Sequence, residues 1–579
     1  QPYVRRDLRE LLRSLKGIIR ETGRFEDHTG IGDTIFIVAA PSDKDASPFA
    51  DVRFVLFEEQ EKRVPRIRSF GWRREFIGRT VLTHNLERLE WSARVNWDKA
   101  WDVEGLTEQF YRDYAQVFAN VLSQVKGAAD DKQAHAWTQL LFNRLLFIAF
   151  IQRMGWLRAP NGSKDGYLFD LFKGPRGSFK TFYGMLRAVF AELDTEDSSP
   201  TKGKFSADIG DVPYLNGGLF DRDDPLDIPG IELPDTAFGE VLSETGGLFA
   251  RYNFTVTEST PLDQEVAVDP EMLGKIFERL IIASERHGSG TYYTPRPIVE
   301  FMVNEAIKGY LVDRGLSAEK AAILVDEDRV EPQKGEDGPA FLPSELQDTL
   351  EWLFEIRAVD PACGSGAYLL MLLQRIFDLV DRVEVSRDKG RNVNQKHLYE
   401  TKLRILQRCV YGVDLSETGI RLARLRVWLS LVVENKGEKP EPLPNFDFLI
   451  MQGDSIASPL FPAQNVLGYP REEIREYTRL KGRFFHPKPG ETRPTREQMK
   501  KQRTRISDAF EGELSRSSLR SLSQMPFDWE VEFAEVFDPQ DSEETMGGAL
   551  NLDVEAGRRG QGELATRTRR FPGFDIVVA

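Results

Sequence analysis

The stretch that most restricts the fold is VDPACGSGAYLL, residues 359–370, because it joins a short apolar strand to a helix through small residues. The strand ends at Asp360, glycines stand at 364 and 366, and a helix is predicted to begin near Ala367. Glycine permits backbone conformations that other residues avoid, and it lets a ligand approach the main chain closely. This order predicts an α/β fold with a ligand site at a helix N-terminus.

The loop does not match the common phosphate-binding patterns. Leu369 takes the place of the third glycine of the dinucleotide motif G-x-G-x-x-G, and no Lys followed by Ser or Thr completes a P-loop. Pyrophosphate is therefore not the favoured ligand. Taken alone, a Gly-Ser-Gly loop is equally typical of an ordinary strand-to-helix turn.

Two further predicted strands also end in aspartate. CVYGVDLS (409–416) ends in Asp414, and DFLIMQGDSI (447–456) ends in Asp454. An acidic residue at the end of the neighbouring strand can accept both ribose hydroxyls of an adenosine, and the next carboxylate can accept the adenine amino group. Each aspartate alone is also typical of a helix N-cap. Three such strands at one sheet edge favour a nucleoside site.

The chain is too long for one hydrophobic core, since domains usually hold about 150 residues. Composition and periodicity change along it and predict a small α/β or α+β domain, a helical domain, a doubly wound α/β part, a basic polar insertion and a final strand. The corresponding ranges are 1–104, 105–285, 286–457, 458–570 and 571–579.

Composition excludes several classes of protein. Two cysteines rule out a disulfide framework and a Cys-based zinc site and fit a reducing cytoplasm, and six scattered histidines offer no metal pair. The apolar run 145–151 is far shorter than the roughly 20 residues that span a bilayer, so a buried helix and no membrane partner are expected. A net charge of −15 argues against a uniformly basic nucleic-acid binder but allows a local basic surface.

Four ordered segments resemble amino-group DNA methyltransferases. DPACGSGAYL looks like their motif I, YGVDLSETGIRLARLRVWLSL like motif II, GDSI like motif III, and DPEMLGKIFERLI with HGSGTYYTPRPIVEFMV like motif X and its preceding helix. LLFNRLLFIAFIQRMGWL, YLNGGLF and PFDWEVEFAEVF resemble segments of the long type I, type IIG and phage-defence methylases, including the phage-growth-limitation type. The resemblance covers well over half of the chain.

This resemblance implies a class I, Rossmann-like methyltransferase that moves a methyl group from S-adenosylmethionine to N6 of adenine in double-stranded DNA (the EC 2.1.1.72 class). It implies a restriction-modification or phage-defence role, other subunits of such a system being further candidate partners. Thr294 would lie near the methionine carboxylate, Asp414 would hold the ribose and Asp454 the adenine amino group. The full set of implied cofactor-binding residues is Tyr293, Thr294, Asp360, Ala362, Gly364, Gly366, Asp414, Leu415, Asp454 and Ser455.

The catalytic motif of this family, Asn-Pro-Pro-Tyr, follows directly after a strand that resembles FDIVVA (574–579). An exocyclic amino group is a poor nucleophile, and the flipped base needs an aromatic ring to stack on. We therefore expect the catalytic groups beyond Ala579, in a longer polypeptide that completes the sheet.

Two other functions stay open. Type IIG enzymes carry a nuclease, and DVRFVLFEEQEKR offers Asp51 with Gln60 and Lys62, or the acidic pair Glu59 and Glu61; the required carboxylate-x-Lys reads Gln-x-Lys here. The chain could instead be a non-catalytic scaffold that binds S-adenosylmethionine.

A basic segment interrupts the acidic chain at residues 471–505, which hold twelve Lys or Arg against five Glu. It would leave the sheet on the side where DNA must arrive. We expect Arg493, Arg496, Lys500 and Lys501 to contact phosphates, although charge runs are more often solvated insertions.

Overall fold

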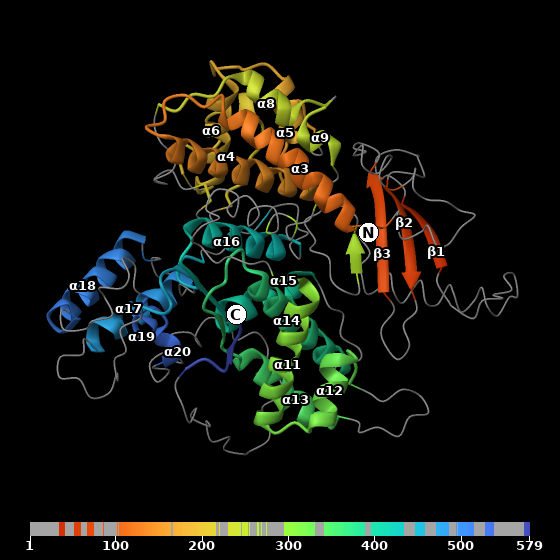
Figure 1. The fold of residues 1–579 in the computed structure, drawn as a ribbon, viewed down its shortest axis with the longest axis vertical. Helices are drawn as coiled ribbons and strands as arrows, with labels where there is room; N and C mark the ends of the chain where they lie inside the picture. Colours follow the sequence, from red (N-terminus) through yellow and green to blue (C-terminus); the bar gives the residue numbers. More distant parts are fainter. Residues whose placement is uncertain are drawn as a thin grey trace, which may run out of the picture.

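The chain is represented by a computed structural model (Figure 1). It describes residues 34–40, 51–58, 66–73, 85, 101, 103–163, 166–197, 199–215, 219–220, 230–244, 246–252, 254, 263–265, 268, 272, 274, 294–330, 341–387, 395–433, 440, 446–457, 471–485, 494, 496–514, 527–537 and 573–579.

The N-terminal region forms a small sheet. Strands β1 (Thr34–Ala40), β2 (Asp51–Glu58) and β3 (Arg66–Arg73) pair antiparallel, and β4 (Asp263–Glu265) adds parallel to β3. Because β4 comes from residues assigned to the helical domain, the expected boundary at 104 does not enclose the whole sheet. Backbone pairing over such a separation leaves no pattern in the sequence.

A helical layer lies at the top of the view in Figure 1. Its helices are α3 (Val103–Leu122), α4 (Asp131–Ile151), the 3-10 helix η3 (Gln152–Met154), α5 (Tyr167–Lys173), α6 (Phe182–Leu193), α7 (Ser206–Ile209), α8 (Asp235–Leu242) and α9 (Leu248–Arg251). Helix α4 is long and apolar enough to cross a membrane, but 83% of its apolar window is buried inside the protein. The expected buried helix is therefore observed.

The second sheet is entirely parallel. Its strands are β5 (Ala358–Asp360), β6 (Val410–Asp414), β7 (Ile450–Gln452) and β8 (Ile576–Val577), in the spatial order β7-β6-β5-β8. The surrounding helices are α11 (Arg296–Arg314), α12 (Ala318–Asp326), α13 (Pro343–Glu355), α14 (Ala367–Arg387), α15 (Gln395–Cys409) and α16 (Glu417–Val432). The expected α/β architecture with a parallel sheet is confirmed.

Both faces of this sheet are covered, because successive residues of a strand point to opposite sides. On β6, a Cβ placed on Gly412 would lie 2.7 Å from Leu369 of α14. The ring of the preceding residue, Tyr411, packs on the other face against Phe533 and Phe574, with centroids 5.0 and 5.3 Å apart.

The crossover between β7 and β8 carries a compact helical unit. It contains α17 (Arg471–Phe485), α18 (Arg496–Leu514), α19 (Trp529–Glu532) and α20 (Ala534–Phe537). Ile474, Tyr477, Met499 and Ile506 form a core of their own, so the described part of this region is not a purely solvated insertion. Buried Lys481 ties α17 to α20 through both carboxylate oxygens of Glu535, at 2.9 and 3.0 Å.

This unit is polar in composition but buried at its centre. The aromatic rings of Phe533 and Phe574 pack on Tyr411 of β6, and the burial of these rings is a net stabilising contribution. The Lys481–Glu535 pair adds little net stability, since desolvation offsets much of its attraction, but it is costly to break. Packing thus holds the unit, and the buried charges restrict the arrangements that it can adopt.

The carboxyl end of β5 is buried. Asp360 is 1% exposed, and its Oδ1 accepts a hydrogen bond from the backbone N–H of Ala362 at 3.0 Å. Burial raises the pKa of Asp360 to about 7; the Ala362 N–H opposes this shift, and the nearby charge of Asp414 adds to it.

Replacing Lys481 by Met should destabilise the protein by about 3–5 kcal/mol, because the buried Glu535 carboxylate loses its partner. The double variant Lys481→Met/Glu535→Met removes both charges and should recover most of the loss. Urea unfolding measures both. If Lys481→Met were no less stable than the double variant, Lys481 and Glu535 would not act as a pair.

Asp360→Asn should change how stability depends on pH. Between about pH 4 and 7, the unfolded aspartate is ionised while the folded one keeps its proton, so wild-type stability falls as pH rises, by up to about 1.4 kcal/mol per unit. Below and above this window the contribution is constant.

The Asn side chain can still accept the Ala362 N–H but does not titrate. The stability of the variant relative to the wild type should therefore rise from pH 4 to 7 and then level off in urea unfolding. Asp348→Asn, at an exposed position of α13, is the matched control. If the stability of the wild type and of Asp360→Asn changed with pH in parallel, the conclusion that Asp360 is buried and protonated would be wrong.

Candidate functional site

The glycine loop after β5 is held by close packing. Gly366 has φ +86°, and a Cβ at this position would lie 3.0 Å from the side chain of Ala423 in α16. Gly364 also has a positive φ, +49°. Both glycines of the sequence motif therefore satisfy a conformational requirement, and at 366 a side chain would also collide with α16.

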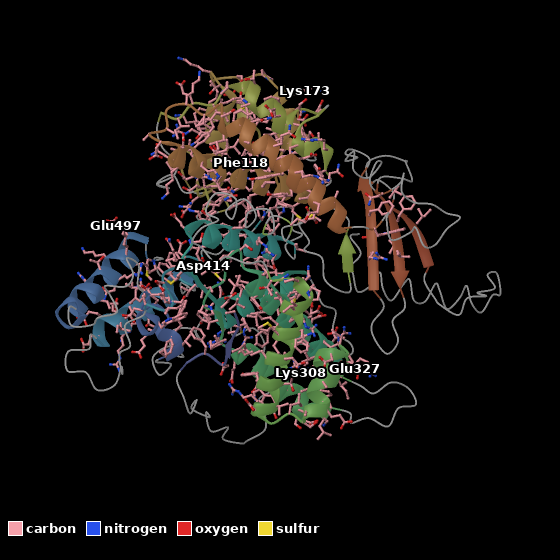
Figure 2. The ribbon with its side chains drawn as sticks, viewed as in Figure 1. Phe118, Lys173, Lys308, Glu327, Asp414 and Glu497 are labelled. Carbon is pink, nitrogen blue, oxygen red and sulfur yellow. The ribbon has the colours of Figure 1, made fainter. Side chains whose placement is uncertain are left out.

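The Asp414 carboxylate connects the end of β6 to this loop. Its Oδ2 accepts the backbone N–H of Gly364 at 2.8 Å, and its Oδ1 accepts the N–H of Ser416 at 2.7 Å. Asp414 is half-buried, near the centre of Figure 2. A carboxylate offers about four acceptor positions, so both oxygens retain capacity for a ligand hydroxyl.

Asp454 lies in the turn that follows β7. Its Oδ1 accepts the backbone N–H groups of Ile456 and Ala457, both at 3.1 Å, and the Ser455 hydroxyl donates to the Pro361 carbonyl. The backbone N–H of Gly453 donates to the Asp414 carbonyl at 2.9 Å. The three strand ends are thus joined: β7 bonds to β6 and, through Ser455, to the loop after β5.

Two large aliphatic side chains are exposed beside these carboxylates. Leu415 directly follows Asp414 and is 60% exposed, and Ile456 follows the Asp454 turn and is 91% exposed. An edge that combines carboxylates with exposed aliphatic groups suits a ligand with a flat apolar ring and polar substituents. Ile456 was not among the predicted site residues, because nothing in its sequence context distinguishes it from a core residue.

The predicted residues of this edge have different surroundings. Asp414, Asp454, Ser455 and Gly364 are partly exposed, and Ala362 is exposed. Asp360 is buried beneath the loop with its pKa raised by burial, so it shapes the loop rather than facing solvent.

Arg426 supports the glycine loop from the buried side, and the sequence did not predict it as a site residue. It is 2% exposed and donates to the Ser365 carbonyl at 2.9 Å. A Cβ on Gly274 would lie 2.8 Å from its Nη1 and 3.0 Å from the Ser365 hydroxyl, so Gly274 lies close to the loop. In the sequence, only the glycine at 274 could have indicated that another side chain packs closely here.

The remaining predictions are placed only in part. Thr294 precedes α11 and is partly exposed, and no contact among the described residues joins it to the glycine loop; Tyr293 lies outside the described residues. Lys500 and Lys501 are exposed on α18, the side chain of Arg496 is not described, and Arg493 lies outside.

The nuclease candidates fall largely outside the described residues. Asp51 begins β2 but its side chain is not described, and Glu59, Gln60, Glu61 and Lys62 lie beyond that strand, where nothing is described. Within the described part of the chain, no group of three or more His, Cys, Asp and Glu side chains could hold a metal ion.

The order of the strands in the sheet indicates where a ligand would bind along this edge. In sequence order the strands run 3-2-1-4, so the direction of winding reverses between β5 and β8. Open α/β sheets bind ligands outside the carboxyl ends of their strands at this reversal. Asp360 and the glycine loop stand at the reversal, with Asp414 and Asp454 on the next two strand ends.

Two curated proteins are similar in sequence. Over 333 residues the chain is 28% identical to "Putative type II restriction enzyme and methyltransferase RM.MjaORFECS2P" of Methanocaldococcus jannaschii, covering 55% of the chain and 27% of that protein. Over 106 residues it is 30% identical to the type II restriction enzyme and methyltransferase RM.Eco57I of Escherichia coli, covering 17% of the chain and 11% of that protein. The matches thus span about a quarter or less of these relatives.

No protein-family model matches the chain. Among solved structures, the Type IIL restriction-modification enzyme MmeI in complex with DNA aligns with 61% of the chain and 40% of its own, with a TM-score of 0.40 and 14% identity. By sequence, the chain is similar to enzymes that are named as both restriction enzymes and methyltransferases.

Proposed function

We propose that the chain binds S-adenosylmethionine as part of a DNA methyltransferase of a restriction-modification system. The observation that carries this proposal is the set of three strand-end aspartates around a glycine loop at the sheet reversal. The named activities of the two sequence relatives support the same reaction class.

Each residue has a role that its surroundings allow. Asp414, whose oxygens retain acceptor capacity, would take the ribose hydroxyls, and Asp454 would take the adenine amino group beside the exposed side chains of Leu415 and Ile456. The loop backbone at Gly364 and Gly366 would approach the ligand. S-adenosylmethionine, when bound, supplies an activated methyl group.

The acceptor in this proposal is N6 of adenine in double-stranded DNA, within a class I methyltransferase fold. It rests on the motif resemblance and not on a described contact. A bifunctional type IIG endonuclease-methyltransferase is the second candidate, favoured by the restriction-enzyme names of both relatives. A non-catalytic scaffold would bind the cofactor without transferring the methyl group.

Helix α18 is the proposed DNA-contacting element. Lys500, Lys501 and Arg505 are exposed on it, in a chain with a net charge of −15, and the helix belongs to the unit that is inserted after β7. Lysine and arginine contacts to phosphates position DNA without reading its sequence.

Asp414→Ala should weaken S-adenosylmethionine binding by about 1.5–3 kcal/mol, which is roughly 10- to 150-fold in Kd, because the ribose loses a charged acceptor. Calorimetric titration measures the affinity, and circular dichroism checks folding. Glu417→Gln removes a nearby exposed carboxylate that pairs with Arg421, and should leave the Kd within about twofold. Unchanged affinity in folded Asp414→Ala would remove Asp414 from the site.

The double variant Lys500→Gln/Lys501→Gln should bind all DNA sequences more weakly. The slope of log affinity against log salt should flatten by up to about 1.8, or 0.9 for each phosphate that the protein no longer neutralises. Lys500→Arg/Lys501→Arg keeps both charges and should retain the wild-type slope. If the salt slope of the Gln variant were unchanged, Lys500 and Lys501 would not contact DNA phosphates.

A further inference from the structure

The segment that begins at Phe527 covers the turn that carries Asp454. The backbone N–H of Phe527 donates to the Asp454 carbonyl at 3.2 Å, and the indole Nε1 of Trp529 donates to the Ser455 carbonyl, also at 3.2 Å. A Cβ on Gly453 would lie 2.6 Å from the Phe527 ring. A segment more than seventy residues away in sequence therefore fixes the backbone of this turn.

The direction of the Asp454 carboxylate depends on that backbone. Its Oδ1 accepts the N–H groups of Ile456 and Ala457, so the side chain turns with the peptide units that Trp529 and Phe527 hold. A change at the Ser455 carbonyl would reach the carboxylate through one or two peptide bonds.

Trp529 itself packs within a cluster of aromatic rings. Its ring lies 4.9 Å from Phe527, 5.9 Å from Phe533 and 6.1 Å from Phe574, measured between centroids. Behind these rings, Lys481 donates to the Glu532 carbonyl at 2.7 Å.

The same support reaches the exposed basic helix. Arg503 of α18 forms an ion pair with Glu532, which also accepts the Tyr477 hydroxyl at 3.3 Å. Figure 1 shows α17 to α20 together, in blue. The turn, the aromatic cluster and α18 are thus joined by direct contacts through α19.

We propose that Trp529 is a positioning residue that sets the Asp454 carboxylate for recognition of the adenine amino group. This inference rests on the proposed function. Trp529 acts through the Ser455 carbonyl and the turn backbone, and it needs no contact with the cofactor itself.

The test uses the full chain and two probes, S-adenosylhomocysteine and its analogue with hypoxanthine in place of adenine. Hypoxanthine presents a carbonyl oxygen where adenine presents an amino group, so a well-placed carboxylate should favour the adenine form at least tenfold. Trp529→Phe keeps a ring and loses the N–H donor. It should bind the adenine form about tenfold more weakly, with little change for the hypoxanthine form.

A double-mutant cycle separates positioning from general stability. In an Asp454→Ala background, Trp529→Phe should cause no further loss of affinity, because the carboxylate that it positions is absent. Trp428→Phe is the matched control, since Trp428 is buried in α16 against Phe446 at 5.8 Å, and should retain the base preference. If Trp529→Phe does not fold, a benzothienylalanine at 529 removes the N–H while keeping the ring shape.

The outcomes separate the two proposals. A folded wild type that binds neither probe would overturn the proposed function. A wild type that binds and prefers adenine, with a Trp529→Phe variant that keeps both the affinity and the preference, would overturn only the positioning role. The positioning role would also be overturned if Trp529→Phe lost equal affinity for both probes, or if its loss added to that of Asp454→Ala. Trp529 would then be a general packing residue.

Discussion

The carboxylate of Asp414 is the group on which the site depends. It accepts one N–H from the glycine loop and one from the start of α16, so a single side chain fixes the loop after β5 to the helix after β6. Hydrogen bonds to an ionised acceptor are roughly twice as strong as neutral ones, and this side chain makes two. The side chain is also partly exposed, so the proposed recognition of the cofactor would depend on the same residue that holds the loop in place.

The aspartates of this edge differ in exposure, and the difference divides their roles. Asp360 is buried and its pKa is raised to about 7 by loss of hydration, which makes it a poor partner for a polar ligand but a suitable support for the loop. Asp414 and Asp454 are partly exposed, and both accept backbone N–H groups. Three aspartates at the same edge of the sheet therefore have different surroundings.

The sequence by itself determined the parallel α/β part and the sheet edge that carries the candidate site. The glycines at 364 and 366, and the aspartates at the ends of β5 and β6, follow from short local patterns. The third strand was expected to end in Asp454, but β7 ends two residues earlier, at Gln452, and Asp454 lies in the turn after it. Such patterns report which residues begin and end each element, and the carboxyl ends of parallel strands must share an edge. Composition likewise identified the buried apolar helix near 145–151.

Only the tertiary structure decided which distant groups support that edge. The bond from Trp529 to Ser455, the packing of Gly274 against Arg426 and the addition of β4 to the N-terminal sheet each join segments far apart in the chain. No periodicity marks such contacts, because each depends on where whole elements pack and not on neighbouring residues. Burial likewise depended on tertiary packing, since Asp360 is buried while Asp414 and Asp454 are partly exposed only because of the elements packed around them.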